Sequence, residues 1–173
     1  MQDFYNTIVI GSGLAGLNLA RRATKYGSVL IITKGQLAES NSWLAQGGIA
    51  AVFSDQDSYQ KHIEDTMKAG AYHNNKAIVK KIIEAAPATI KKLQQLGVKF
   101  NQTKQKLDLH REGGHSENRI IHNGDRTGQS IQKVLIKYVK SSPKIDIIEN
   151  ALVFKLLVYK KACFGVSIIK HDQ

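Results

Sequence analysis

Cysteine, proline and long apolar runs are scarce in this chain of 173 residues. The single cysteine, Cys163, cannot form an intrachain disulfide, which excludes a disulfide-stapled scaffold and is typical of a reducing compartment. With only 2 prolines and 42% hydrophobic residues, the composition argues against disorder. No apolar run approaches the roughly 20 residues that a membrane-spanning helix needs, and no secretory signal is evident at the N-terminus. These absences predict a cytoplasmic globular protein without a membrane segment.

Positive charge is abundant, since the formal net charge is +11. Such a charge raises the question of nucleic-acid binding. The lysines occur as scattered pairs, however, such as Lys80–Lys81, Lys91–Lys92 and Lys160–Lys161, and are not interleaved with aromatic residues that could stack on bases. We therefore interpret them as solvated helix faces and expect no nucleic-acid partner.

The first part of the chain predicts a β-α-β unit. Residues 4–10 and 28–33 are β-branched and apolar, as in buried parallel strands, and a helical pattern lies between them. Gly11, Gly13 and Gly16 form a G-x-G-x-x-G motif between the first strand and the helix. In this context the glycines allow a tight turn, close approach of a pyrophosphate and close helix–strand packing. A purely structural glycine turn is the alternative.

The end of the second predicted strand departs from the usual dinucleotide pattern. An acidic residue is common there because it binds the adenosine ribose. This chain has Lys34 instead, and the first carboxylate beyond it is Glu39. A cation at this position could indicate NADP in place of NAD, but the remaining motifs do not suit a nicotinamide enzyme.

The rest of the chain predicts a large insertion at about 35–125 and then a return to the parallel sheet. We expect 145–149 to be its third strand and the last two strands to begin an antiparallel meander. The predicted helices are 58–70 (capped by Asp57 or Ser58), 76–86, 87–97 and 127–140, and the other predicted strands are 98–101, 106–111, 151–159 and 163–170. Residues 112–128 are rich in glycine and polar residues and predict a functional loop. The fold class is a Rossmann-like α/β domain, which we expect to be incomplete because the meander stops at the chain end.

The segment "NSWLAQGGIAA" at 41–51 is poor in large side chains. Its glycines and alanines allow the backbone to lie against a flat ligand, and its amide and hydroxyl side chains can bond polar ring edges or phosphates. A glycine turn followed by a small-residue helix is the structural alternative.

Five segments together resemble the L-aspartate oxidases, flavoproteins of the succinate dehydrogenase/fumarate reductase superfamily. They are "IVIGSGLAGLNLA", "TKG", "SNSWLAQGGIAAV", "DSYQKHIEDTMKAG" and "HREGGHSENRIIHNGDRTGQ". The resemblance covers essentially the whole chain and implies FAD as the cofactor. The residues that it implies for cofactor binding are Gly11, Ser12, Gly13, Leu14, Ala15, Gly16, Lys34, Asn41, Ser42, Trp43, Leu44, Ala45, Gln46, Gly47, Gly48 and, through its backbone near adenine, Val153.

Two positions separate the branches of this superfamily. Membrane-bound succinate and fumarate enzymes attach the flavin covalently to a His at the position of Asn41, so the resemblance implies noncovalent FAD here. Glu112 stands where that branch has an apolar aromatic residue, and a carboxylate there could recognise the ammonium group that distinguishes aspartate from succinate. Glu112 is thus the expected substrate-orienting residue, and His115 is expected to line the same pocket. A solvated loop carboxylate is the alternative for Glu112.

The resemblance implies oxidation of L-aspartate to iminoaspartate with oxygen or fumarate as acceptor, in the quinolinate route to NAD, with quinolinate synthase as a downstream partner. It also places the proton-transferring Arg in a capping domain and further groups in later segments, so we expect no catalytic residue in this chain, no capping or C-terminal helical domain, and no turnover by the chain alone. A succinate or fumarate flavoprotein fragment and a non-catalytic chain are the alternatives. His115 and His122 have no Cys or acid pattern around them, so we predict no metal site. An interrupted sheet would favour self-association.

Overall fold

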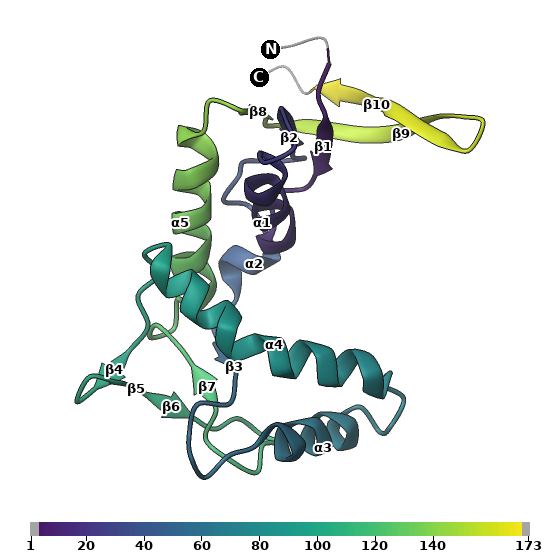
Figure 1. The fold of residues 1–173 in the computed structure, drawn as a ribbon. Helices are drawn as coiled ribbons and strands as arrows, with labels where there is room; N and C mark the ends of the chain where they lie inside the picture. The colour runs from purple at the N-terminus through teal and green to yellow at the C-terminus, as the bar shows by residue number, and fades with distance from the viewer. Residues whose placement is uncertain (1–3, 171–173) are drawn as a thin grey trace. The chain divides into compact units, whose positions relative to one another are not determined.

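The computed structural model describes residues 4–170, which form two compact units (Figure 1). The first unit contains the described residues up to Leu44 and those from Ile131 onward, and the second contains Ala45–Ser130.

A three-stranded parallel sheet organises the first unit. Its strands are β1 (Thr7–Ile10), β2 (Val29–Ile32) and β8 (Ile145–Ile148), in the order β1-β2-β8. Strand β2 is central, with a paired neighbour on each edge, and all four of its residues are buried because both faces of the sheet are covered. The predicted Rossmann-like α/β class and the third parallel strand are therefore confirmed.

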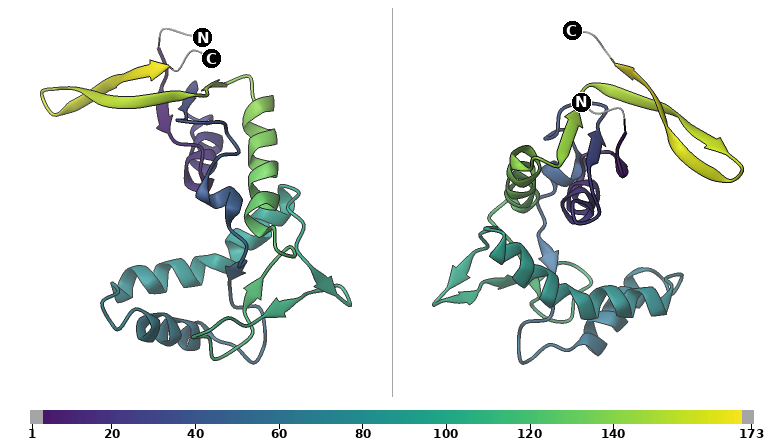
Figure 2. Two further views of the ribbon diagram at one scale, coloured as in Figure 1. Left: turned by 180° about the vertical axis from the view of Figure 1, so that it is seen from behind. Right: turned by 45° about the horizontal axis from the view of Figure 1, so that its top comes forward.

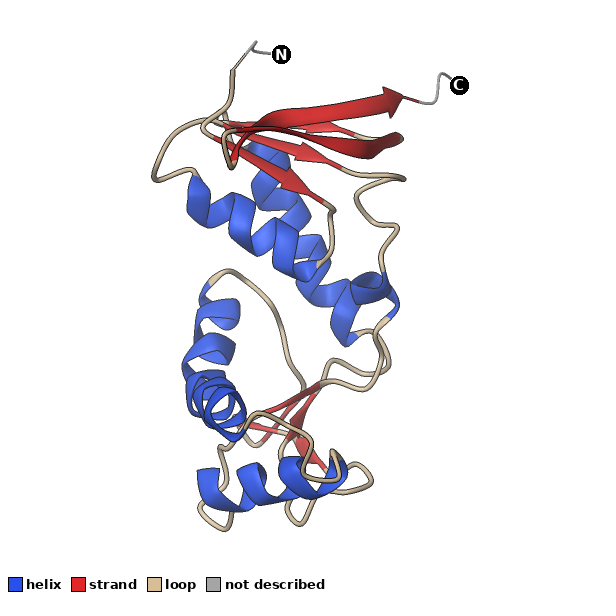
Figure 3. Cartoon of the chain, turned by 90° about the vertical axis from the view of Figure 1, so that its right-hand side faces the viewer, coloured by secondary structure: helices blue, strands red, loops and turns tan. Residues whose placement is uncertain are grey.

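Helices cover one face of this sheet and a β-hairpin packs on the other. Figure 3 shows α1 (Leu14–Ala23) and α5 (Thr127–Ser141) on the same side of the parallel strands. Leu30 and Ile32 form a cluster with Ala151, the first residue of the hairpin. Alternate residues of a strand point to opposite faces, so Val29 and Ile31, the other two buried residues of β2, point toward the helices.

The hairpin consists of β9 (Ala151–Tyr159) and β10 (Ala162–Lys170), joined by Lys160 and Lys161 (Figure 2). These two lysines have φ angles of 46° and 66°, as in a two-residue type I′ turn. The hairpin end exposes large apolar side chains, including Phe154, Tyr159 and Phe164. The predicted antiparallel pair of strands is thus confirmed. This hairpin contains most of the exposed large apolar side chains of the first unit.

In the second unit, two helices pack through an apolar stripe. They are α3 (Tyr59–Ala69) and α4 (Lys76–Gln95). Ser58 caps α3 by accepting a hydrogen bond from the Lys61 N–H, and Asn75 caps α4. Within residues 4–170, no helix is both long and apolar enough to cross a membrane.

The prediction that Pro87 begins a new helix is wrong, because Pro87 lies inside the continuous helix α4. Proline has no N–H to donate, so it removes one hydrogen bond from a helix interior. The helix nevertheless continues, since Ile83 and Ile90 on either side of Pro87 are both buried, and Ile83 packs against Ile63 and Met67 of α3. Tertiary packing overrides the local signal here.

Short strands replace the longer ones predicted for this unit. The strand expected at 98–101 is wrong: Val98 and Phe100 are buried, but in a segment without strand structure. Five short strands of this unit are labelled in Figure 1. Their bounds are β3 (Ile49–Ala50), β4 (Gln102–Thr103), β5 (Lys106–Leu107), β6 (Leu109–His110) and β7 (Ile120–Ile121). Strand β7 lies within the segment predicted as a loop, and it pairs with both β3 and β6.

Candidate functional site

The glycine motif forms the turn from β1 into α1. Gly11 has a φ of 100°, a conformation that L side chains rarely adopt, and its N–H donates to the Ile32 carbonyl at 2.8 Å. A Cβ atom on Gly16 would lie 2.1 Å from the Gly11 carbonyl oxygen. Two of the three glycines are therefore required by the protein itself, one for the turn and one for helix–strand contact.

Gly13 differs, because nothing in the protein requires a glycine there. Its φ is −64°, and an added Cβ would meet Ser42 Oγ at an ordinary 3.6 Å. It is the N-cap of α1 but has no side chain to cap the helix. Within residues 4–170, the N–H groups of Ala15 and Gly16 have no acceptor, whereas that of Leu14 donates to Ser42 Oγ at 3.2 Å. This end of the helix thus offers free N–H groups and open space, which suits a diphosphate.

Other sequence-predicted residues surround this loop in the first unit. The Ser12 hydroxyl is buried and shares a hydrogen bond with Thr33 Oγ1 at 3.0 Å, so its backbone is the part left for a ligand. Lys34 follows β2 and is exposed. Val153 lies opposite Ile168 in the hairpin and packs on the Leu30–Ile32–Ala151 cluster. The side chain of Val153 is thereby occupied by core packing.

The first half of the small-residue segment forms a one-turn helix, α2 (Asn41–Leu44), that the sequence did not predict. Ser42 faces the glycine loop through its bond to Leu14. Asn41 and Leu44 are exposed, and Leu44 is 73% exposed. Exposure of a leucine at this level leaves apolar surface available to a ligand or another part of the protein.

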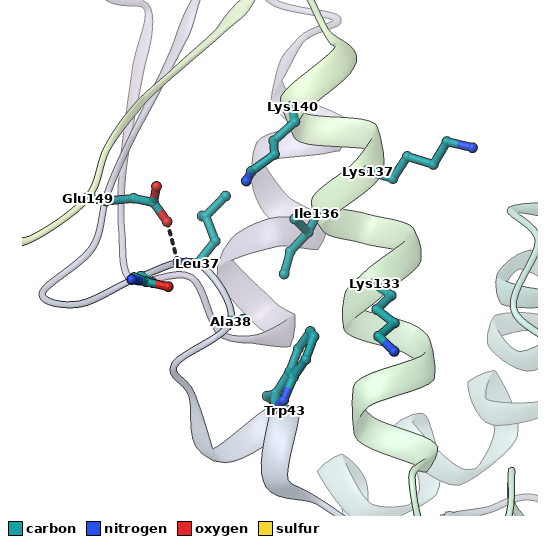
Figure 4. A pocket seen from close by; sticks show the side chains of 9 residues that line it. Leu37, Ala38, Trp43, Lys133, Ile136, Lys137, Lys140 and Glu149 are labelled. Atoms are coloured by element: carbon teal, nitrogen blue, oxygen red, sulfur yellow. Dashed lines mark hydrogen bonds between the residues drawn. The ribbon is translucent and has the colours of Figure 1, made fainter.

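Trp43 points instead into a pocket of about 270 Å³ (Figure 4). Figure 4 shows its indole ring facing α5, and Lys133 Nζ lies 5.8 Å from the ring centroid. Across the pocket, Glu149 Oε1 accepts a hydrogen bond from the Leu37 N–H at 2.6 Å. The Trp43 side chain therefore anchors α2 to α5 and leaves its backbone for any cofactor contact.

The second half of the segment belongs to the second unit. Ala45, Gln46 and Gly47 are exposed, and an added Cβ on Gly47 would meet nothing within 4 Å. Gly48 has a φ of 90°, and a Cβ there would lie 2.6 Å from the Ile121 carbonyl oxygen. The fold thus requires Gly48 for its approach to β7, whereas Gly47 remains open for a ligand.

The loop with Glu112 is held at its end by a buried arginine that the sequence analysis did not single out. Arg119 is fully buried and donates two hydrogen bonds of 2.9 Å to Asp57. A third bond goes to Asp65, which also accepts from the Ser116 N–H and hydroxyl at 2.8 Å. We call Arg119, Asp57, Asp65 and Ser116 the Arg119 network.

The Arg119 network corrects one reading of the sequence. Asp57 was one of two candidate caps for α3, but Ser58 is the cap and the Asp57 carboxylate binds Arg119. A bidentate pair of this kind is strong and geometrically specific. The only sequence feature that singled out Asp57 was its position just before a helix. Because ordinary N-cap residues occupy the same position, this feature could not reveal the pair with Arg119.

Charge in the Arg119 network shifts nearby pKa values. Burial acts to raise the pKa of Asp65, but hydrogen bonds from Ser116 and Arg119 outweigh it and lower the pKa to about 2. Burial, followed by the Arg119 charge, lowers the pKa of His62 below its usual value. Asp65 is therefore ionised at neutral pH, and the neutral form of His62 is favoured.

The substrate-side residues lie on the exposed part of this loop. Glu112 is exposed, and within residues 4–170 its carboxylate has no ion pair or hydrogen bond; its carbonyl accepts from the His115 N–H at 3.2 Å. The His115 ring lies 6.0 Å from that of His62, edge to face. His122 instead lies beside His110, with ring centroids 4.0 Å apart. The structure therefore places Glu112 and His115 in one turn and gives His122 a different neighbour.

The parallel sheet, the glycine turn and the open helix N-terminus define a dinucleotide-binding α/β protein. The FAD binding domain family matches residues 6–173, and the chain belongs to that family. FAD is accordingly the cofactor, and the open surface at Gly13 fits its diphosphate.

Several proteins that are similar to this chain in sequence are L-aspartate oxidases. The chain is 39% identical to the chloroplastic L-aspartate oxidase of Oryza sativa over 174 residues, covering 98% of this chain and 27% of that protein. It is 42% identical to the L-aspartate oxidase of Bacillus subtilis over 160 residues, covering 91% of this chain and 30% of that protein. An E. coli quinol fumarate reductase has a similar structure, with a TM-score of 0.89 and 25% identity over 98% of this chain and 30% of that chain.

The chain spans between 26% and 38% of the length of the relatives that it matches. The similarity therefore includes nearly all of this chain but a minority of each relative.

Proposed function

We propose that this chain is the FAD-holding part of an L-aspartate oxidase, with FAD bound noncovalently. The observation that carries the proposal is the open diphosphate cradle at Gly13 in the first unit. In the second unit, the exposed Glu112 carboxylate, which has no ion pair within residues 4–170, supports it. Similarity to L-aspartate oxidases of plants and bacteria supports the substrate. When bound, FAD would accept a hydride from the substrate α-carbon.

The residues of this chain would bind and orient rather than transfer protons. The free N–H groups of Ala15 and Gly16 would hold the diphosphate, and Lys34 would lie near the adenosine ribose. Asn41 through Gly48 would line the flavin side, with Gln46 as a polar contact and the Val153 backbone near adenine. Asn41 has no nucleophilic atom with which to attach a flavin covalently.

Glu112 would recognise the ammonium group of aspartate, with His115 lining the same pocket. A carboxylate binds an ammonium group through a short, charge-assisted hydrogen bond. The Arg119 network fixes Ser116 in the same loop, which limits the positions that Glu112 can sample. Groups for proton transfer and for binding the substrate carboxylates would come from segments that the relatives have beyond this chain.

Flavin retention tests the cofactor half of the proposal. The purified chain is incubated with FAD, desalted, and examined for a visible flavin band that denaturation releases. A retained, releasable band supports noncovalent binding by this chain. A band that stays with the denatured protein contradicts the noncovalent assignment, and a colourless protein contradicts the claim that this chain holds FAD by itself.

Substitution of Glu112 tests the substrate half, in a polypeptide that also carries the segments found in the relatives. Glu112→Gln should raise the KM for L-aspartate about tenfold or more, because a hydrogen bond to a charged group contributes about 1.5–3 kcal/mol. Steady-state kinetics with aspartate and succinate measure this effect. Glu117→Gln is the matched control, since Glu117 lies in the same loop but is paired with Lys61 at 2.6 Å. Equal KM values for the Glu112 variant and the unsubstituted protein would remove the proposed role.

The second candidate is a part of a succinate or fumarate flavoprotein. The fumarate reductase structural similarity favours it at the level of the fold. In the same kinetic experiment, oxidation of succinate in preference to aspartate would support this candidate over the first.

A further inference from the structure

Asp108, His110 and His122 share one face of the small sheet in the second unit. In the β6–β7 ladder, Leu109 pairs with Ile121 and His110 with Ile120. Continuing this antiparallel register by one step sets Asp108 opposite His122. Since side chains alternate between faces, Asp108 and His110 point to the same side as His122.

The ligating atoms of the three residues lie at metal-site separations. Asp108 Oδ2 is 3.4 Å from His110 Nε2 and 3.7 Å from His122 Nε2, and all three atoms lie within 4.8 Å of one another. Bonds of about 2.0–2.1 Å at tetrahedral angles set ligand atoms about 3.4 Å apart. Small side-chain movements would therefore complete a three-ligand set.

A buried nitrogen without a partner points toward a ligand here. His122 is 8% exposed, and its Nε2 atom is buried with no hydrogen bond within the described residues. A buried polar atom without a hydrogen-bond partner destabilises the folded state. A metal ion held between His122, His110 and Asp108 would satisfy it.

In contrast to the sequence-based prediction of no metal site, we propose that Asp108, His110 and His122 form a binding site for a divalent transition metal ion of the zinc type. Two imidazoles and one carboxylate suit zinc, whereas magnesium and calcium prefer oxygen ligands. The side chain of His110 is 59% exposed, so the ion can enter from solvent and keep water in its remaining position. The site rests on this sheet alone and does not depend on the proposed oxidase activity.

The metal would also clamp the loop that carries Glu112. His110 and His122 lie at the two ends of the segment 111–121, at the point where β6 meets β7. The backbone is already positioned there, since the Asn101 N–H donates to the His122 carbonyl at 2.8 Å and the Asp108 N–H donates to the Asn101 carbonyl at 3.0 Å. A bound ion would close the base of this loop and slow its local opening.

Titration of the tag-free, chelator-treated chain with Zn²⁺ by calorimetry tests the site. We expect one ion per chain, and at least tenfold weaker binding in Asp108→Asn and in His110→Asn. The His110 side chain is exposed and that of Asp108 is only partly buried, so these variants should fold, which circular dichroism verifies. His73→Asn is the matched control, because His73 is exposed and outside the cluster, and it should bind like the unsubstituted chain.

Three outcomes would overturn the proposal. They are the absence of stoichiometric Zn²⁺ binding, binding by the Asp108 and His110 variants equal to that of the unsubstituted chain, and loss of binding only on substitution of the His62–His115 pair. Hydrogen exchange supplies the loop readout: Zn²⁺ should slow exchange in peptides covering 108–122 of the unsubstituted chain but not of His110→Asn. Unchanged exchange at saturating Zn²⁺ would contradict the clamp.

Discussion

In the first unit the candidate cofactor groups are mainly backbone atoms of a short, local motif, whereas in the second unit the candidate substrate residue stands on a loop held by distant side chains. Gly11 to Gly16 form their turn within a few residues, and the open position at Gly13 follows from it. The loop with Glu112 depends on Arg119 meeting Asp57 and Asp65 from another part of the chain. The difference teaches that the first site is encoded locally, while the second exists only after tertiary folding.

The largest expected effect is on the second unit. Arg119→Met leaves the buried Asp57 carboxylate without its partner and should destabilise this unit by about 3–5 kcal/mol, as for other buried pairs that lose one member. Hydrogen exchange of peptides from 45–130, compared with peptides from the first unit, measures the loss separately for each unit. Lys61→Met is the control, because it removes only exposed interactions of the Lys61 ammonium group, with Glu117 and the Gln56 carbonyl, and should cost about 1 kcal/mol or less. Similar losses in the two variants would break the comparison.

Next in size is the effect of a methyl group in the glycine turn. Gly16→Ala should destabilise the first unit by about 1–3 kcal/mol, because its Cβ would meet the Gly11 carbonyl. Gly13→Ala is the matched variant: its folding stability should stay nearly unchanged, while its retention of FAD falls. Denaturant unfolding and flavin absorbance measure the two effects. Undiminished flavin retention by Gly13→Ala would show that the open position is not the diphosphate site.

The smallest expected effect is the pH dependence that Asp65 gives to the second unit. The folded pKa of Asp65 is about 2, below its usual value of 3.8, so this group stabilises the fold above about pH 4. That contribution should be lost as the pH falls from about 4 toward 2, because the unfolded chain takes up the proton first. Denaturant unfolding between about pH 4 and pH 2, monitored by hydrogen exchange of peptides from the second unit, measures this loss of stability. Asp65→Asn should make the stability of that unit less dependent on pH. An unaltered dependence in this variant would assign acid sensitivity to other groups.

Elements with a strong local pattern were predicted well. Apolar runs identified β1, β2 and β8, and the glycine motif located the turn into α1. The sequence predictions failed where the local pattern was weak and packing against a distant segment decided the structure. Pro87 lies inside α4 because the helix packs on α3, and Ile120–Ile121 forms a strand because β3 and β6 lie beside it.

The sequence by itself determined the three parallel strands, the glycine turn and the FAD family. The reason is that short-range sterics and hydrophobic patterns act between neighbours in the chain. Only the tertiary structure decided that Arg119 is buried between two carboxylates and that Asp108, His110 and His122 converge. The physical reason is that charge pairing and metal-ligand geometry depend on distances in space. Those distances are fixed only when separated segments pack together.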